Sequence, residues 1–326
     1  MLNYSKAIEK SRAKDILNRD LESVRLSHAY LFLSQDENYL KCFCEYVCKL
    51  LINNNESENI EKNNLRIEKQ IHPDVKFFGL EKAIDVKIAT DIVESAEYSP
   101  FESDKKIIVI FNVGDMNDAS QNKILKTIEE PPKNTYFILA ASGKTKILQT
   151  ILSRVKEIEL EPISQELIYE MLLDNKINSQ TAEIIASCAN GNATFAEKLT
   201  TDIGFIQFYE NIVSMLQFLD GSKDVLKYSV MFNDKKIDKN EFFDINNMIL
   251  RDVLCVYAQT EQLIINKNIK EQLKIISKKL NIDSILALIE KCSECQKMLS
   301  FNVSSTAVVD EYLFKLAEVK VLCRRL

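Results

Sequence analysis

The sequence has few residues of the kinds that many catalytic and binding sites need. It holds only two histidines, His28 and His72, and neither stands in a motif with a serine or cysteine nucleophile. It also has no basic excess: the formal net charge is −6, whereas a protein that grips nucleic acid by itself is usually basic. Histidine-based catalysis and unaided nucleic-acid binding are therefore disfavoured.

Long apolar runs are missing as well. No segment approaches the ~20 apolar residues that a membrane-spanning helix needs. Residues 1–17 are charged and amphipathic, and they lack the apolar centre of a secretory signal. We therefore expect a cytoplasmic protein with no membrane partner, whose eight cysteines are reduced thiols.

Helix breakers are scarce, and their distribution divides the chain. All five prolines lie at or before position 162, and only Gly204 and Gly221, of six glycines, follow position 191. Because segments without these residues favour helices, the later part of the chain is predicted to be helical.

Before position 162, apolar runs alternate with helical patterns. Predicted strands are residues 28–33, 74–80, 105–113, 135–141 and 156–160, and predicted helices are residues 5–24, 38–52, 86–97 and a segment from Asp118 to the Pro131-Pro132 pair. This last helix opens with a capping-box pattern, Asp118 to Gln121. The alternation implies a parallel α/β sheet, in which the polar residues 53–69 form an exposed insertion.

The fold class predicted from these patterns is α/β followed by all-α, in three domains. Residues 1–161 form the sheet domain, residues 162–203 a small helical domain that begins at Pro162, and residues 204–326 a larger helical domain.

The cysteines make a poor metal site. Cys42, Cys44 and Cys48 lie on one predicted helix without a fourth ligand nearby, although His72 could in principle complete the set. Cys292 and Cys295 form a single CxxC pair inside a helical stretch, which is weak evidence for redox or metal chemistry. We interpret these thiols as parts of helix cores and expect no zinc.

The densest motif is NKILKTIEEPPKNTYFILAASGKTKILQTILSRVKEIEL, residues 122–160. It closely resembles the clamp-loader branch of the AAA+ ATPases, whose hallmark is LLKTLEEPP, a FIL-type strand and a Ser-Arg-Cys motif. RLSHAYLF at residues 25–32 and HPDV at residues 72–75 match the same family, and residues 299–316 resemble its closing helices more weakly. The resemblance implies an AAA+-like sheet domain, a helical lid (162–203) and a C-terminal helical collar domain (204–326) that binds other subunits.

In this sequence, the residues that bind phosphate in the family's P-loop are replaced. A P-loop uses glycines so that backbone N–H groups can surround phosphates, followed by a lysine and a hydroxyl residue. In register with the family, the glycine positions hold Ser34, Glu37 and Tyr39, the lysine position holds Leu40 and the hydroxyl position holds Lys41. Asp36 and Glu37 would also face a triphosphate, and each like-charge contact costs about 4 kcal/mol at ~4 Å and an effective dielectric near 20. We expect no ATP binding and no other cofactor.

Two further positions agree with this interpretation. Where the family's ATPases carry acidic Walker B residues, the third strand ends in Asn112, and Asp115 lies too far along the chain. Near the position of the family's lid arginine, the sequence has Phe195. The three deficits favour the delta-prime type of clamp-loader subunit, which does not hydrolyse ATP.

The resemblance gives Arg154 a role that the residue alone would not suggest, since most exposed arginines are solvated surface charges. In the family, the arginine of the Ser-Arg-Cys motif enters the ATP site of the next subunit as an arginine finger. Here Ser153 supports the motif and Val155 replaces its cysteine.

The implied partners are the tau/gamma and delta subunits, with the sliding clamp and primer–template DNA reached through the complex. We expect no intrinsic enzymatic activity, so that DNA polymerase activity belongs only to the holoenzyme. Two alternatives stay open: an ATP-hydrolysing clamp-loader subunit, and an AAA+-derived scaffold outside replication. Four lysines could line a nucleic-acid channel or be solvated surface charges: Lys123, Lys126, Lys144 and Lys146.

Overall fold

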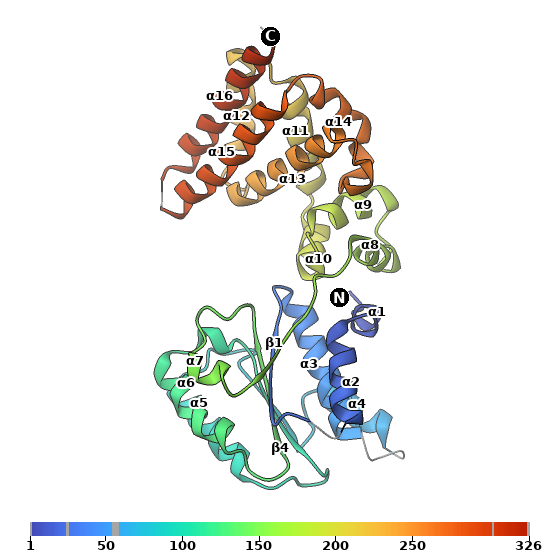
Figure 1. Ribbon diagram of the computed structural model, residues 1–326, viewed down its shortest axis with the longest axis vertical. Helices are drawn as coiled ribbons and strands as arrows, with labels where there is room; N and C mark the ends of the chain where they lie inside the picture. Colours follow the sequence, from blue (N-terminus) through green and yellow to red (C-terminus); the bar gives the residue numbers. More distant parts are fainter. Residues whose placement is uncertain (1, 24–25, 54–58, 302, 325–326) are drawn as a thin grey trace. The chain divides into compact units, whose positions relative to one another are not determined.

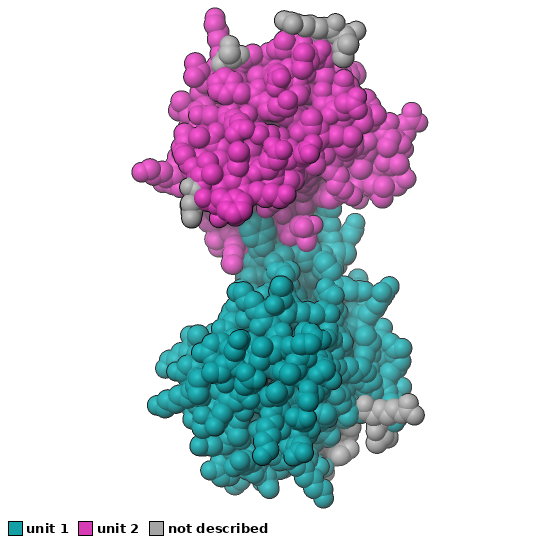
Figure 2. Space-filling model, turned by 60° about the vertical axis from the view of Figure 1, so that its left-hand side comes forward, with its two compact units in different colours: residues 1–171, 191–197 teal, residues 172–190, 198–326 magenta. Residues whose placement is uncertain are grey.

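The structure, a computed structural model, describes residues 2–23, 26–53, 59–301 and 303–324 (Figure 1). The chain forms two compact units, which are coloured separately in Figure 2. The first unit is Met1–Met171 with Gly191–Glu197, and the second is Leu172–Asn190 with Lys198–Leu326. The two units thus share the residues of the predicted lid between them, and the division into three domains stays a prediction.

A five-stranded parallel sheet forms the centre of the first unit, in the order β2-β3-β4-β1-β5. The predicted strands are confirmed, with shorter ends. Their bounds are β1 Ala29–Leu33, β2 Val75–Phe78, β3 Lys106–Ile110, β4 Thr135–Ala141 and β5 Lys156–Glu159. Every residue of β1 and β3 is buried, as expected for parallel strands that are covered on both faces.

Helices cover both faces of this sheet (Figure 1). One face carries α5 Val86–Glu97, α6 Asp118–Glu129 and α7 Gln149–Leu152, and the other carries α2 Arg12–Glu22, α3 Glu37–Ile52 and α4 Ile60–Glu68. A short α1, Ser5–Glu9, precedes them, and a 3-10 turn η2, Val113–Asp115, follows β3. Ile92 of α5, Ile124 of α6 and Ile151 of α7 join Leu31 of β1 in one hydrophobic core. The predicted parallel α/β class is therefore confirmed.

Two local predictions were wrong, and a third was incomplete. Residues 5–24 form two helices, because Ser11 accepts a hydrogen bond from Lys14 N (3.2 Å) and caps a new helix there. Asn117, rather than Asp118, caps α6 by accepting from Ser120 N at 2.8 Å. The predicted exposed insertion is helical over α4, which packs on α3 and buries Asn63 and Ile67; residues 54–58 lie outside the described residues.

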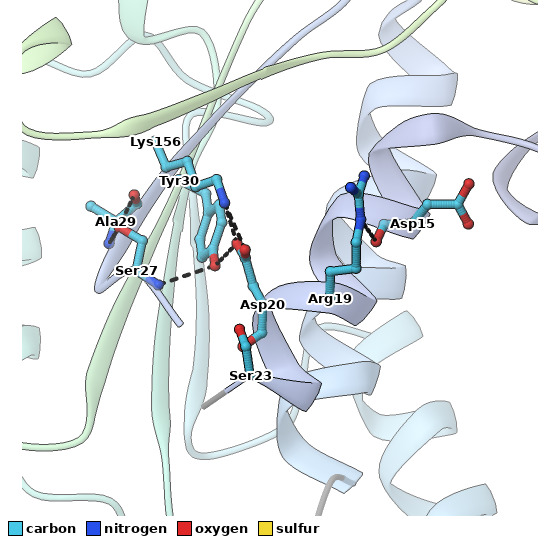
Figure 3. Close-up of polar contacts among 8 residues, drawn as sticks. All are labelled: Asp15, Arg19, Asp20, Ser23, Ser27, Ala29, Tyr30 and Lys156. Atoms are coloured by element: carbon cyan, nitrogen blue, oxygen red, sulfur yellow. Dashed lines mark hydrogen bonds and ion pairs between the residues drawn. The ribbon is translucent and has the colours of Figure 1, made fainter. Parts of the chain in front are cut away.

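A partly buried carboxylate fixes α2 to the sheet (Figure 3). Asp20 accepts hydrogen bonds from Tyr30 Oη of β1 at 2.8 Å and from Lys156 Nζ of β5 at 2.6 and 2.7 Å. Ser27 N donates to Tyr30 Oη at 3.1 Å. Burial raises the pKa of Tyr30, so the phenol stays a neutral donor.

The second unit is helical, as the scarcity of breakers predicts. Its helices are α9 Ser179–Cys188, α11 Phe205–Phe218, α12 Ser222–Phe232, α13 Lys239–Tyr257, α14 Lys270–Ser277, α15 Ile282–Ser300 and α16 Ser305–Cys323, with 3-10 turns η3 Glu261–Leu263 and η4 Lys267–Ile269. Two helices contribute to both units, α8 Gln165–Asp174 and α10 Ala193–Thr201. No helix in the described part of the chain is long and apolar enough to cross a membrane.

A buried polar network holds α9 within the second unit. Asn266 Oδ1 accepts from Ser187 Oγ of α9 at 3.2 Å and from Tyr209 Oη of α11 at 2.9 Å. The backbone and side-chain nitrogens of Asn266 both donate to Asp252 of α13 at 2.7 Å. Because these residues are buried and mutually satisfied, the network fixes one arrangement of α9, α11 and α13.

Candidate functional site

The first candidate site is the turn that joins β1 to α3, at the carboxyl edge of the sheet. Ser34 N donates to Ala141 O of β4 at 3.2 Å, and Ser34 Oγ accepts from Asp36 N at 3.1 Å. Asp36 then caps α3, because its carboxylate accepts from Tyr39 N at 2.9 Å. The turn therefore passes directly from strand to helix without a glycine-rich loop.

The side chains in the predicted P-loop positions do not form a phosphate site. Tyr39 and Leu40 are buried in the first unit, and Tyr39 stacks on Tyr4 with ring centroids 5.9 Å apart. Glu37 is exposed, whereas Ser34 and Lys41 are half-buried. Where the family's ATPases place a lysine, this chain thus has an apolar side chain in its core.

The backbone donors at the start of α3 already have partners. Asn38 N donates to Thr194 Oγ1 at 3.0 Å, Tyr39 N to Asp36 Oδ1 at 2.9 Å, and Leu40 N to Asp36 O at 2.9 Å. A P-loop helix binds phosphate through its first-turn N–H groups. Here acceptors from the same chain take those donors.

Asp36 has a different role from the one predicted. We expected its carboxylate to repel any triphosphate at this turn, but Asp36 is 3% exposed and its carboxylate is turned toward α10. Its oxygens accept from Ala193 N at 2.6 Å, Thr194 N at 3.2 Å and Thr194 Oγ1 at 2.5 Å. The predicted repulsion therefore applies to Glu37 alone, while Asp36 fills the space with an internal anion.

The end of β3 lacks acidic groups close to this turn. Asn112 is exposed in the left-handed region (φ 55°) and donates from Nδ2 to Gly79 O at 3.1 Å. Asp115 is exposed farther along and lies 3.6 Å from Lys146 Nζ. An open hollow of about 520 Å³ lies beside these residues, with Asp118 and Thr145 also on its wall. Asp115 and Lys146 offset each other, so Asp118 is the remaining charged side chain among the residues that line the hollow.

Phe195, near the expected lid arginine, is half-buried on α10, and its backbone N donates to Asn192 Oδ1 at 2.8 Å. It supplies no charge toward the turn.

Two of the four lysines considered for nucleic-acid binding form ion pairs: Lys144 Nζ lies 2.6 Å from Glu157, and Lys146 Nζ lies 3.6 Å from Asp115. Lys123 and Lys126 are exposed on α6.

The second candidate site is Arg154, in the turn between α7 and β5. Its guanidinium donates through Nη2 to Glu129 Oε1 at 2.8 Å, and through Nη1 to Thr150 O and Ser153 Oγ, each at 3.0 Å. The side chain is 34% exposed. Ser153 therefore contacts Arg154 directly, which fits the supporting role predicted for it.

The two candidate sites lie at opposite ends of the parallel strands. β1 and β5 are parallel neighbours, with Tyr30 opposite Lys156 and Leu33 opposite Glu159. Arg154 precedes the amino end of β5, whereas Asp36 follows the carboxyl end of β1. Because five strand residues span roughly 16 Å, Arg154 cannot act at the β1–α3 turn of its own chain.

The HPDV motif is structural. The carboxylate of Asp74 accepts from the backbone nitrogens of Phe101, Glu102 and Ser103 at 2.5, 2.9 and 2.8 Å. His72 Nδ1 accepts from Asp74 N at 3.2 Å, and its Nε2 lies 3.4 Å from Glu102. His72 is thus committed to the loop that precedes β3.

The cysteines lie in helix cores. Cys44, Cys48, Cys292 and Cys295 are buried, and burial raises the pKa of each thiol. Cys42, half-buried, has its pKa raised to about 11, also mainly by burial. Within the described residues, no group of three or more His, Cys, Asp or Glu side chains is placed to hold a metal ion. The absence of zinc nevertheless stays an expectation.

The strand order and the helices on both faces define a parallel α/β domain followed by helices. Two family models match the chain: "DNA polymerase III, delta subunit" over residues 9–164 and "DNA polymerase III, delta subunit, C terminal" over residues 204–307. DNA polymerase III subunit delta' of Bacillus subtilis (strain 168) is 24% identical over 319 residues, which cover 94% of this chain and 96% of that protein. The chain belongs to the delta-prime family of DNA polymerase III subunits.

More distant similarities include other subunits. DNA polymerase III subunit tau of Escherichia coli (strain K12) is 30% identical over 122 residues, 35% of this chain and 19% of that protein. Among solved structures, a gamma subunit-related protein of Thermotoga maritima aligns over 94% of this chain and 99% of its own, at 16% identity and a TM-score of 0.39. The Bacillus subtilis clamp loader delta protein aligns over the same shares, at 14% identity and a TM-score of 0.36.

Sequence reasoning identified the β1–α3 turn and Arg154 but missed two partners of Asp36, Tyr4 and Thr194. Tyr4 Oη lies 3.5 Å from Asp36 Oδ1 and 3.2 Å from Thr194 Oγ1. Thr194 is 158 positions away from Asp36. Only the N-cap position of Asp36 was readable locally, because an aspartate before a helical pattern is a start signal.

Proposed function

We propose that the chain is a non-hydrolysing subunit of a bacterial clamp loader, which places Arg154 in the ATP site of the neighbouring subunit. The position of Arg154 is the observation that carries this proposal. It is partly exposed, held by three acceptors and located at the sheet edge opposite its own P-loop-like turn. An arginine in that place cannot reach the β1–α3 turn of its own chain, and its partial exposure leaves it accessible to a site on another subunit.

Arg154 is chemically suited to this task. A planar guanidinium stabilises the charge that spreads over a phosphoryl group during transfer, and it cannot lose its proton at physiological pH. Its present partner, Glu129, is itself 47% exposed. Since such surface pairs contribute about 1 kcal/mol or less, exchanging Glu129 for a phosphate costs little.

The β1–α3 turn supports the second part of the proposal, that the subunit binds no ATP itself. The donors that would hold phosphates are taken by Asp36 and Thr194, and a buried leucine stands in the lysine position. The subunit then acts as a rigid stator with no intrinsic activity. Polymerase activity belongs to the holoenzyme alone.

The proposed partners are the tau/gamma ATPase subunit and the delta subunit, bound through the helices of residues 204–326 as a collar. Relatives named delta', gamma and tau support this assignment. The sliding clamp and primer–template DNA are reached through the complex. The compartment would be the cytoplasm.

The test compares Arg154→Ala with a matched control, Arg12→Ala, which removes an exposed arginine 3.2 Å from Glu161. Both variants are mixed with purified tau/gamma and delta subunits, and the products are sized. We expect both to assemble and only Arg154→Ala to depress clamp-stimulated ATP hydrolysis, by up to roughly 10³-fold at the site served. Unchanged turnover would refute the finger, and failure of the unmodified chain to assemble would favour a scaffold outside replication.

A further inference from the structure

Two helix starts converge on a single carboxylate in the first unit. The first turns of α3 and α10 both donate to Asp36: one oxygen accepts from Tyr39 N of α3, and the other accepts from Ala193 N and Thr194 N of α10. The first N–H groups of a helix have no partner within the helix, and they give its start a partial positive charge. An anion between two such starts accepts from both and favours their close approach.

The carboxylate of Asp36 is an anion that the chain itself places between the two helix starts. Asp36 is 3% exposed and Thr194 is 8% exposed. Thr194 Oγ1 donates to Asp36 Oδ1 at 2.5 Å and accepts from Asn38 N at 3.0 Å, which adds a second link between the helices. Because water has little access, these charge-assisted bonds are stronger than exposed ones.

The segment that leads into α10 is built for this close approach. Gly191 has a φ of +82°, and a Cβ there would lie 2.5 Å from Pro162 Cβ. Gly191 O accepts from Ile163 N at 2.9 Å, and Asn192 Nδ2 donates to Gln35 O at 3.0 Å. Residues 191–197 therefore belong to the sheet unit, although the chain leaves that unit on either side of them.

We propose that Asp36 is a built-in substitute for a bound phosphate: its carboxylate joins residues 191–197 to the start of α3 without any nucleotide. This inference rests on the proposed function, in which the turn takes no ATP. Beyond that function, we infer that residues 191–197 stay attached to the start of α3 at all times. A subunit of this kind presents one conformation of residues 191–197 at every stage of a partner's ATP cycle.

Asp36→Ser is the variant that separates the two helices. Serine caps a helix nearly as well as aspartate, so α3 keeps its N-cap. The serine hydroxyl is a single oxygen on a shorter side chain, so it cannot also reach Ala193 N. Thr194→Val is a second variant, which removes the hydroxyl link and leaves Asp36 in place. Asp85→Ser is the matched control, because Asp85 caps α5 alone, by accepting from Ile88 N at 2.8 Å.

Hydrogen exchange on the full chain, followed by mass spectrometry, measures the outcome. We expect Asp36→Ser to speed exchange in peptides covering residues 191–201 about tenfold or more, and Thr194→Val to do so less strongly. Residues 37–52 should change less than about twofold, and Asp85→Ser should leave both segments unchanged.

Three results would overturn the inference: no change at residues 191–201 in Asp36→Ser, equal loosening of residues 37–52 and 191–201, or the same loosening in Asp85→Ser. The same experiment with Mg·ATP and the unmodified chain tests the proposed function separately. New protection of residues 34–40 by Mg·ATP would show nucleotide binding and refute that proposal, whereas a null result for Asp36→Ser would count against the carboxylate link alone.

Discussion

Glu129 accepts a hydrogen bond from Arg154 at 2.8 Å, and this pair joins the last residue of α6 to the turn before β5. The two most characteristic segments of the sequence, Glu-Glu-Pro-Pro and Ser-Arg, therefore meet in space. Both side chains keep substantial access to solvent, 47% for Glu129 and 34% for Arg154. Water screens a pair of this kind, which makes it easy to open.

The first prediction concerns stability. We expect Arg154→Ala and Glu129→Ala each to lower the free energy of unfolding by about 1 kcal/mol or less, because an exposed ion pair contributes little. Urea denaturation followed by circular dichroism measures the difference. A loss above about 2 kcal/mol would mean that Arg154 is a structural residue, and any effect of Arg154→Ala on a partner's ATPase would then need another explanation.

The second prediction concerns the loop at residues 98–104. Asp74→Asn weakens the carboxylate that holds the backbone nitrogens of Phe101, Glu102 and Ser103. Phe101 is 85% exposed, so chymotrypsin can reach it as soon as the backbone loosens. We expect cleavage after Phe101 to become about tenfold faster, and Asp91→Asn, an exposed carboxylate on α5, to leave the rate unchanged.

The carboxylate of Asp74 also makes the stability of this loop depend on pH in the acid range. Burial alone would raise the pKa of Asp74, but the three N–H groups and His72 outweigh it and lower the pKa. A lowered folded pKa contributes stability above the unfolded value of about 3.9 and loses it as pH falls through the folded value. Hydrogen exchange at residues 101–103 should therefore stay protected at pH ~4, where a free aspartate is about half protonated, and loss of protection at that pH would contradict the assignment.

The strands and the helical second half were predictable because each depends on local composition. β1 and β3 are continuous apolar runs, and residues 205–324 contain almost no helix breaker. By contrast, α4 was missed because its Asn- and Glu-rich sequence shows only Asn63 and Ile67 as buried contacts. One short buried stripe leaves no clear period in a sequence.

The site was predictable only where its chemistry is local. The missing glycines and lysine between Ser34 and Lys41 can be read directly, and so can Ser153-Arg154. The partner of Asp36 cannot, because Thr194 follows it by 158 positions and is adjacent only after the chain returns to the sheet unit. Contacts between distant segments depend on packing, which a single sequence does not reveal.

The third prediction uses Lys320, which is 1% exposed on α16 and donates to Leu216 O at 2.5 Å. Burial lowers its pKa to about 7, against the opposing effect of Asp220 and Asp224 and with help from Lys279 and Arg324. An unfolded lysine keeps its proton to about pH 10.4, so the unfolded chain binds more protons between pH 7 and 10. The contribution of Lys320 to stability therefore rises with pH across that window.

Lys320→Met should remove this rise. We expect the unfolding free energy of the variant, relative to the unmodified chain, to fall by roughly 3 kcal/mol between pH 7 and pH 10. Lys315→Met is the control, since Lys315 lies on the same helix with its amine 3.0 Å from Glu318 and 36% of its side chain exposed. Parallel pH profiles for both variants would show that Lys320 is charged in the fold.

The last prediction has the opposite sign and concerns Glu241, in the first turn of α13. Burial raises its pKa to about 7, and Asp238, Asp202 and Asp244 add to this effect. Among the described residues, no donor reaches its Oε1. The partial positive charge at the start of α13 favours the ionised form, but it does not compensate for burial beside three carboxylates.

Because the folded pKa of Glu241 is raised, the folded chain binds more protons than the unfolded chain between pH ~4.3 and 7, so stability falls as pH rises through that window. Glu241→Gln stays neutral and escapes this loss. We expect the variant to be more stable than the unmodified chain by about 1–2 kcal/mol at pH 8, after allowance for its partial exposure, and equal to it near pH 4.5. Urea denaturation at both pH values measures the difference, with the exposed Glu290→Gln as a control that should show none. A variant equally stable at both pH values would mean that Glu241 is ionised in the fold and that solvent reaches it freely.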